Sequence, residues 1–304
     1  MSIYETDIWR VGIIKSPMKT VVSQGIRAVH WLNKEPSFRF LADPFGLHQD
    51  NKFYIFAEGY DYKDRHGRIE VLILDEALHL LDRTVVLQEP WHLSYPMIIK
   101  DQGQIYMLPE AYKSGRTTLY KAKCFPYQWE SVSEFIFPEI AIDPSVFFHN
   151  GLWWMFYTPA DSGYSRQSVL SVAYSENLLG PWQPHSQNPV RITPSSSRPG
   201  GNVLVTDSEI FLPTQDCTMT YGGGISFLKI SHLTSEKFEA HCVKKITADA
   251  TAFGSYCQGI HTLSALGEYT LIDAKRMDQS VLKRLKIDAL FHSRKKLGAL
   301  YMND

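Results

Sequence analysis

The sequence predicts an all-β protein, a five-bladed β-propeller with four-stranded blades, on three observations. Residues 142–159, IDPSVFFHNGLWWMFYTP, form two apolar runs around an Asn-Gly turn, which is a strong hairpin signal. Similar hairpins are expected at 41–58, 94–111, 197–215 and 259–276. Their polar first residues recur every 48 to 63 positions, a period typical of propeller blades, at Asp43, Tyr95, Asp143, Arg198 and His261.

Each hairpin is followed by strand-like runs that would complete a blade. For blades one to four these runs are 67–75 and 81–89, then 117–125 and 129–137, then 167–175, then 222–230 and 238–246. Blade five is expected to begin near residue 260 and to use 287–297 as an outer strand. Within residues 1–40, a strand at 8–14 is expected to close the ring by completing the last blade. Glycine and proline mark turns between strands, so one domain is expected over residues 1–304.

Composition narrows the class of partner. The net charge is −1, which gives no reason to expect nucleic-acid binding. No stretch approaches 18 apolar residues, so no membrane span is expected, and the first residues lack the layout of a signal peptide. The cysteines lack paired short spacing and indicate free thiols in a reducing compartment, without a metal site: Cys124, Cys217, Cys242 and Cys257. We therefore expect a cytoplasmic protein.

The hairpins place a set of polar residues around the central axis. The first strand of every propeller blade lines the channel, and directly opposed residues of a hairpin share one face. Counting outward from the turns, we expect Asp43 opposite Glu58, Tyr95 opposite Glu110 and His261 opposite Asp273. One mouth of the channel should therefore gather Asp43, Glu58, Tyr95, Glu110, Asp143, Arg198, His261 and Asp273.

Several carboxylates in one pocket are typical of chemistry at a glycosidic bond. One carboxyl group can protonate the leaving oxygen while another acts as a base or nucleophile, and crowding separates their pKa values. An aspartate at a strand start can also simply cap a turn. Because the positions are equivalent between repeats, we favour the functional interpretation, with Asp43 as base or nucleophile, Glu110 or Glu58 as acid, and Asp143 tuning the acid. No cofactor is expected, although a carboxylate ring would also suit Ca²⁺ in the channel.

Arg198 distinguishes this ring from a purely acidic one. It lies in Ser-Arg-Pro-Gly-Gly-Asn, where it could make bidentate contacts to an anionic group on the substrate or could only neutralise the surrounding carboxylates. His261 is either part of the same clamp or a buried, satisfied histidine. Lys275 follows the last hairpin and could add positive charge. The predicted ligand is a sugar or nucleotide sugar that carries an anionic group.

The hairpins with Asp-Pro starts resemble the five-bladed propeller of glycoside hydrolase family 43. The resemblance implies a base aspartate on the first blade, a tuning aspartate on the third and an acid glutamate on the fourth. Asp43 and Asp143 match the first two. Arg198-Pro199 stands where the glutamate would be, and Glu209 lies near the wrong end of its strand, so the acid must come from elsewhere.

A closer resemblance is to the N-terminal domain of the glucosamine inositolphosphorylceramide transferase family and its bacterial homologues. Motifs across most of the chain carry it, among them Ala42-Asp43-Pro44-Phe45, His92-Leu93-Ser94-Tyr95-Pro96, Pro109-Glu110, Asp143-Pro144-Ser145, Trp153-Trp154, Arg198-Pro199-Gly200-Gly201, Gln215-Asp216-Cys217 and Gly259-Ile260-His261-Thr262. Gln215 joins the expected substrate-binding residues on this ground. In the plant members the transferase activity is usually credited to a separate C-terminal domain. The resemblance implies a bacterial protein of surface-polysaccharide or glycolipid synthesis.

Three functions follow as hypotheses. The leading one is a carbohydrate-active enzyme that transfers a glycosyl group. The second is a glycoside hydrolase in which another glutamate takes the role of the acid. The third is a non-catalytic propeller that binds glycans. Whether product forms without an acceptor other than water separates the first two, and the third predicts binding without turnover.

Overall fold

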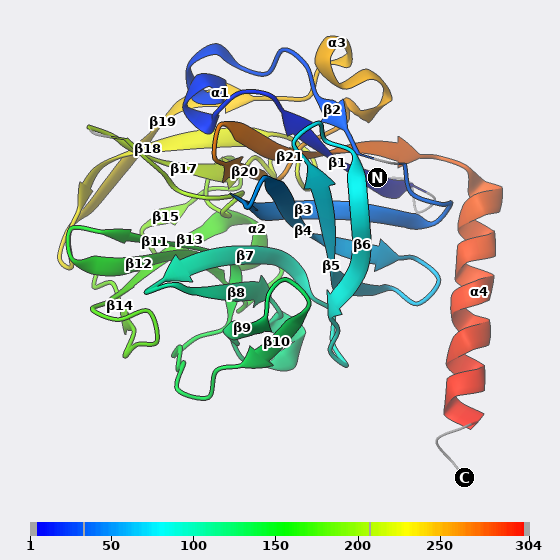
Figure 1. Cartoon of the computed structure of the whole chain (residues 1–304), viewed down its shortest axis with the longest axis horizontal. Coiled ribbons are helices and arrows are strands. Elements are labelled where there is room, and N and C mark those ends of the chain that lie inside the picture. The colour runs from blue at the N-terminus through cyan, green and yellow to red at the C-terminus, as the bar shows by residue number, and fades with distance from the viewer. Residues whose placement is uncertain (1–4, 33, 207, 301–304) are drawn as a thin grey trace.

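The computed structural model describes residues 5–32, 34–206 and 208–300 and confirms the five-bladed β-propeller (Figure 1). The described strands form five antiparallel sheets, each ordered from the central axis outward. Blades one to four follow the order of the chain. Blade one consists of β3 (Arg39–Gln49), β4 (Lys52–Asp61), β5 (His66–Asp75) and β6 (Leu80–Leu87), and blade two of β7 (Ser94–Asp101), β8 (Gln104–Glu110), β9 (Tyr120–Cys124) and β10 (Gln128–Ser131). Blade three consists of β11 (Ala141–His149), β12 (Leu152–Pro159), β13 (Val169–Ser175) and β14 (Gln183–Pro184), with β15 (Arg191–Ile192) also paired to β13, and blade four of β16 (Leu204–Val205), β17 (Ile210–Gln215), β18 (Ile225–Leu233) and β19 (Phe238–Ile246).

The last blade joins the two ends of the propeller. β20 (Leu263–Leu266) and β21 (Tyr269–Asp278) come from the last part of the chain, while β1 (Thr6–Ile14) and β2 (His30–Trp31) supply the third and fourth strands. β1 pairs with β21 over its whole length, so the expected closure by an N-terminal strand is confirmed. The prediction of an outer strand at 287–297 was wrong. The edge of β21 is already taken by β1, and those residues lie in a helix instead.

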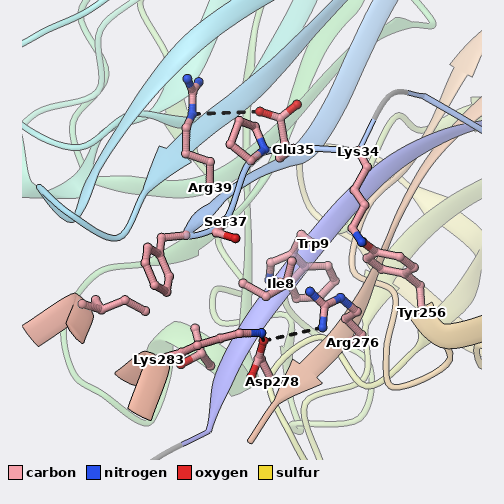
Figure 2. A pocket seen from close by; sticks show the side chains of 14 residues that line it. Ile8, Trp9, Lys34, Glu35, Ser37, Arg39, Tyr256, Arg276, Asp278 and Lys283 are labelled. Atoms are coloured by element: carbon pink, nitrogen blue, oxygen red, sulfur yellow. Dashed lines mark hydrogen bonds and ion pairs between the residues drawn. The ribbon is translucent and has the colours of Figure 1, made fainter. Parts of the chain in front are cut away.

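Short helices and one longer C-terminal helix connect or follow the strands. They are α1 (Met18–Gln24), α2 (Ser165–Ser168), α3 (Ala250–Phe253) and α4 (Val281–Leu300), with the 3₁₀ turns η1 (Tyr112–Ser114) and η2 (Gly254–Tyr256). The N-terminal half of α4 borders a cavity of about 150 Å³, where Lys283 contacts Asp278 and Trp9 is one of the lining residues (Figure 2). Within the described ranges, no helix combines the length and apolar character needed to cross a membrane.

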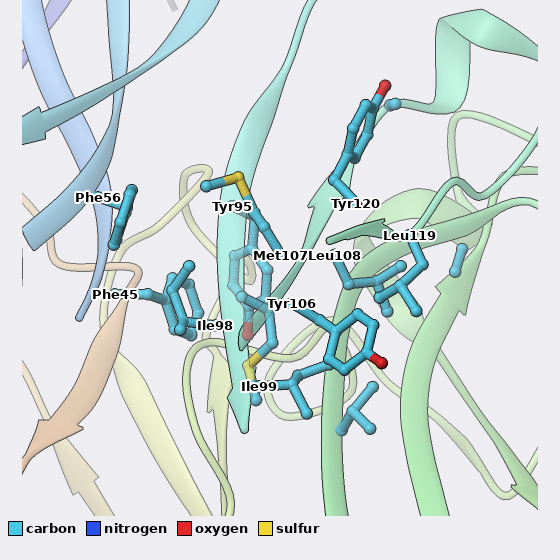
Figure 3. Packing of buried hydrophobic residues seen from close by; sticks show 14 of the residues in the cluster. Phe45, Phe56, Tyr95, Ile98, Ile99, Tyr106, Met107, Leu108, Leu119 and Tyr120 are labelled. Carbon is cyan, nitrogen blue, oxygen red and sulfur yellow. The ribbon is translucent and has the colours of Figure 1, made fainter. Parts of the chain in front are cut away.

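Buried side chains between neighbouring blades hold the blades at fixed angles. Figure 3 shows such a cluster between blades one and two, where Phe45 and Phe56 face Tyr95, Ile98 and Met107. Strand alternation explains it, because every second residue of β7 and β8 points to the same side of its sheet. Interiors packed in this way are rigid, so the starts of the inner strands keep a fixed distance from the axis.

A bulge marks the start of three blades. The register slips between Ala42 and Phe45, between Ser94 and Met97, and between Ile142 and Ser145. The central residues Asp43, Tyr95 and Asp143 have left-handed φ values of 51°, 47° and 49°. Such values in non-glycine residues cost roughly 1–3 kcal/mol each and concentrate at functional sites.

The bulges correct the expected cross-strand pairs by one residue. Glu58 lies opposite Ala42 rather than Asp43, and Glu110 lies opposite Ser94 rather than Tyr95. In blade five, the Asp273 backbone N–H donates to Thr262, so Asp273 faces that residue and not His261. Counting from the turn fails in blades one and two because a bulge sets two residues against one. In blade five the ladder is regular, but its turn is centred between Gly267 and Glu268, which shifts each pair by one residue.

Candidate active site

A polar pocket of about 310 Å³ opens at one mouth of the channel. Blades one, two, four and five contribute to it, together with β1 and the loops before β7 and β18. Its lining side chains are Trp9, Phe40, Asp43, Glu58, Tyr60, Tyr62, Arg65, His92, Ser94, Glu110, Tyr112, Lys113, Arg198, Tyr221 and His261. Three carboxyl groups therefore share one solvent-filled space with several aromatic rings, a combination suited to a sugar.

Glu58 is held by a neutral histidine. The Gly67 N–H donates to His92 Nδ1 at 3.0 Å, so the ring proton sits on Nε2, which lies 3.3 Å from Glu58 Oε1. Burial lowers the pKa of His92 to about 4, which keeps the ring uncharged. Burial and the nearby carboxylates of Asp43 and Glu110 raise the pKa of Glu58 well above its usual value. The surroundings of Glu58 therefore favour the protonated form of its carboxyl group.

Glu110 has the pKa of a group that can exchange protons near neutrality. Ser94 Oγ donates to Oε2 at 2.9 Å, and the Tyr112 N–H donates to Oε1 at 2.7 Å. Burial and the Asp143 carboxylate raise its pKa to about 7, against these hydrogen bonds. A group balanced in this way is suited to general acid catalysis.

Asp43 ends a chain of hydrogen-bonded groups. Thr262 Oγ1 donates to its Oδ1 at 2.6 Å, and His261 Nε2 lies 3.7 Å from the same oxygen. On the other side of the ring, His261 Nδ1 contacts Asp273 at 2.7 Å. Burial raises the pKa of Asp43 to about 6, although the charge of His261 works against the rise. Burial lowers the pKa of His261, but the carboxylates of Asp273 and Asp43 outweigh this and raise it overall.

Aromatic stacking also fixes the ring of His261. The indole of Trp9 stacks on it with 3.7 Å between ring centroids and 9° between planes. Trp9 belongs to β1, so the strand that closes the propeller also completes this wall of the pocket.

Asp143 lies just behind the pocket wall in a closed ion pair. Arg198 Nε and Nη2 contact its two oxygens at 2.6 and 3.2 Å, and Gln215 Nε2 donates to Oδ2 at 2.7 Å. The remaining Arg198 contacts are the Arg166 carbonyl at 3.0 Å and the Tyr221 hydroxyl at 3.5 Å. Of the two readings of Arg198, the structure thus favours neutralisation of a carboxylate over a free anion clamp.

Half of the predicted site residues line the pocket and half support it. Asp43, Glu58, Glu110, Arg198 and His261 line it, whereas Tyr95, Asp143, Gln215, Asp273 and Lys275 do not.

Each of the latter is buried against protein groups. The Tyr95 hydroxyl bonds Ser145 and the Gly201 backbone, and Lys275 Nζ donates to the Tyr221 carbonyl at 2.6 Å. Tyr95 and Lys275 therefore stabilise the protein around the pocket from within and do not line it.

A group of potential metal ligands occurs within the part of the chain that the structure describes. Asp43, His261 and Asp273 bring their ligand atoms within 4.8 Å of one another. Asp273 already accepts from four N–H groups, those of the backbones of Asp43, His261 and Thr262 and of the imidazole. Its lone-pair sites are filled. Protein hydrogen bonds account for this cluster, and Ca²⁺ in the channel stays a prediction.

Sequence reasoning missed most of the aromatic wall. Tyr60 and Tyr62 follow Glu58 at two-residue intervals, Tyr60 within β4 and Tyr62 just after its end, so continued strand alternation puts all three on one face. That signal was present in the sequence. His92, Trp9 and Tyr221 had no such signal, because they reach the pocket from loops or from the other end of the chain.

The fold and pocket define a class of protein: a five-bladed β-propeller with a carboxylate-lined site on its axis. This chain belongs to the family of the N-terminal domain of glucosamine inositolphosphorylceramide transferase 1, whose model matches residues 21–259. A transferase of that name from Oryza sativa subsp. indica is 34% identical over 204 residues, which cover 66% of this chain and 27% of the relative. The chain thus matches less than a third of the length of this relative.

Solved structures with the same fold come from glycoside hydrolases. A family 117 glycoside hydrolase of Zobellia galactanivorans has a TM-score of 0.55 at 14% identity, covering 80% of this chain and 86% of the other. A GH43 β-xylosidase/α-arabinofuranosidase from a compost microbial metagenome has a TM-score of 0.54 at 14% identity, covering 80% and 92%. At such low identity these neighbours establish the fold alone.

Proposed function

We propose that this protein is a carbohydrate-active enzyme that transfers a glycosyl group during the synthesis of a surface polysaccharide or glycolipid, in the cytoplasm. The observation that carries the proposal is the pair Asp43 and Glu110, two carboxyl groups in one aromatic-walled pocket with pKa values of about 6 and about 7. Membership of a family named for a sugar transferase supports the same direction.

The pKa values divide the roles between the two groups. Near neutral pH, Asp43, which has the lower pKa, is mainly ionised, while Glu110, with a pKa of about 7, keeps a large part of its proton. On this proposal Glu110 gives its proton to the leaving oxygen of the donor, and Asp43 acts as the base that accepts the proton of the acceptor hydroxyl, or as the nucleophile at the anomeric carbon. Glu58, whose surroundings favour the protonated form, serves as a hydrogen-bond donor to the sugar.

Supporting residues keep these carboxyl groups in position. Arg198 holds Asp143 behind the wall of the pocket. The negative charge of Asp143 helps raise the pKa of Glu110. Asp273 and Trp9 fix His261 beside Asp43. Preorganised charges of this kind need not rearrange during the reaction, which is the main source of catalysis in such sites.

The proposed anionic group of the substrate needs a cationic side chain that is not already paired with a carboxylate of the protein. Arg198 is engaged by Asp143, and Arg65 is engaged by Asp288 at 2.6 Å. Lys113 lines the pocket, is exposed, and makes no ion pair with any residue that the structure describes. We therefore assign the contact with a phosphate or carboxylate of a nucleotide sugar to Lys113.

Hydrolysis is the second candidate, because the fold is shared with glycoside hydrolases. An incubation of the protein with a panel of nucleotide sugars, with and without sugar or lipid-headgroup acceptors, followed by mass spectrometry, separates the two. Product that carries the sugar on an acceptor hydroxyl supports transfer, and free sugar regardless of acceptor supports hydrolysis.

A matched pair of variants tests the site itself. Asp43→Asn should abolish turnover and retain ligand binding in calorimetric titration. Asp50→Asn, at the exposed outer turn of the same hairpin, should behave as wild type. Binding without turnover by the wild-type protein in every incubation would overturn the enzyme proposal and leave a glycan-binding propeller.

A further inference from the structure

The helix α4 presents a stripe of apolar side chains to solvent. Val281, Leu282 and Leu285 are 43%, 81% and 54% exposed. Residues three and four positions apart are neighbours on a helix surface, so these three side chains form one continuous patch. Leucine at 81% exposure is normal when isolated, but a clustered stripe on a helix at the edge of a fold marks an interaction surface.

The opposite side of α4 is fixed to the propeller, which gives the stripe a defined direction. Ile287 is 1% exposed and borders the cavity of Figure 2. Phe291, four positions after Ile287 and on the same side of the helix, has its ring centroid 4.1 Å from the Arg65 guanidinium. Arg65 also pairs at 2.6 Å with Asp288, at the border between this side and the stripe. Because the stripe lies roughly opposite the buried Ile287, it faces away from the body of the protein. The helix itself stands at the periphery of the ring (Figure 1).

The charge of α4 is strongly positive although that of the whole chain is −1. Its sequence, VLKRLKIDALFHSRKKLGAL, contains six lysines and arginines and one aspartate. Lys283 and Lys286 directly follow the two exposed leucines, and Lys283 remains 52% exposed in its contact with Asp278. Surface ion pairs of this kind contribute little, so Lys283 and Lys286 remain available to an external anion.

We propose that α4 is an interfacial helix that docks the protein on membranes containing anionic lipids. An apolar stripe flanked by lysines is the pattern of helices that lie in the plane of a bilayer surface, with the apolar side among the acyl chains and the cations at the headgroups. A second copy of the chain fits less well, because pairing two α4 helices would bring like charges together. The inference goes beyond the proposed function and does not depend on it, since α4 lies outside the matched residues 21–259.

Docking through α4 would also place the pocket mouth near the lipid surface. Arg65 lines the carboxylate pocket and is the residue that Asp288 and Phe291 of α4 hold. A bilayer bound to the stripe therefore lies one helix diameter, about 10 Å, from this rim.

Co-sedimentation of the full chain with extruded vesicles tests the proposal. Vesicles of phosphatidylcholine with added phosphatidylserine should bind the protein, and pure phosphatidylcholine vesicles should bind it far more weakly. Leu282→Gln with Leu285→Gln should lower the partition coefficient at least about tenfold, and Lys286→Glu should lower it at least about fivefold. Leu80→Gln with Leu81→Gln, two leucines on β6 that are 41% and 53% exposed, is the control and should change nothing.

Three results would overturn the proposal. They are failure of the wild-type protein to bind anionic vesicles, equal loss of binding in the β6 control, and a dimer in light scattering that the α4 variant dissociates. Glutamine favours helices, and near-ultraviolet circular dichroism verifies that each variant keeps the propeller. Turnover of soluble substrates should be the same in the α4 variant and wild type, which distinguishes failure of docking from failure of the proposed enzymatic function.

Discussion

Glu110→Gln should remove activity and stabilise the protein above neutral pH. The Glu110 carboxyl is buried, and its pKa rises from an ordinary 4.5 to about 7 in the folded protein. Between these values the folded state binds more protons than the unfolded state, so this group makes stability fall as the pH rises from about 4.5 through about 7. A difference of about 2.5 pKa units corresponds to about 3 kcal/mol. Glutamine carries no charge and escapes this cost.

The assay is urea unfolding of wild type and variant across the pH range. The difference in unfolding free energy should move by about 3 kcal/mol in favour of the variant between about pH 4 and about pH 8. The amide can still accept from the Tyr112 N–H, and the Ser94 hydroxyl can rotate to accept from it. Glu209→Gln, at a carboxylate that is 38% exposed, serves as the control. Parallel pH curves for Glu110→Gln and wild type would refute the reasoning.

Other substitutions test the parts that position the site. Arg198→Gln should cost about 3–5 kcal/mol of unfolding free energy because it leaves the Asp143 charge buried without its partner, and adding Asp143→Asn should restore much of the loss; equal losses in the single and double variants would contradict an ion-pair role. Gly67→Ala should lower the free energy of unfolding by about 1–3 kcal/mol and reduce turnover, because a Cβ there would lie 2.5 Å from the Leu93 carbonyl oxygen and 2.8 Å from Glu58 Oε1. Gly163→Ala, where a Cβ meets nothing within 4 Å, should leave both stability and turnover unchanged. Trp9→Ala should lower the free energy of unfolding by about 3–5 kcal/mol and narrow the pH range of activity, since it removes the ring stacked on His261. An unchanged pH–rate profile would show that this stacking does not affect the titration of the site.

The sequence by itself determined the repeated hairpins and therefore the fold. Apolar runs around turns such as Asn150-Gly151 are local signals, and their regular spacing required a propeller. The same periodicity identified Asp43 and Glu110, since equivalent positions in successive blades must approach the axis. Closure by β1 was predictable because a ring with a free edge needs a partner strand.

Tertiary structure alone decided which side chains face the pocket and which support it. Bulges at the blade starts shift the facing residue by one, and no local pattern fixes where a bulge turns a side chain. Arg198 lies against Asp143 because the inner ends of blades three and four meet at the axis, a contact between residues 55 positions apart. The helix α4 formed where a strand was expected because β1 already occupied the edge of blade five. Hydrogen bonding along the chain sets local structure, but burial and charge depend on neighbours that only the closed ring brings together.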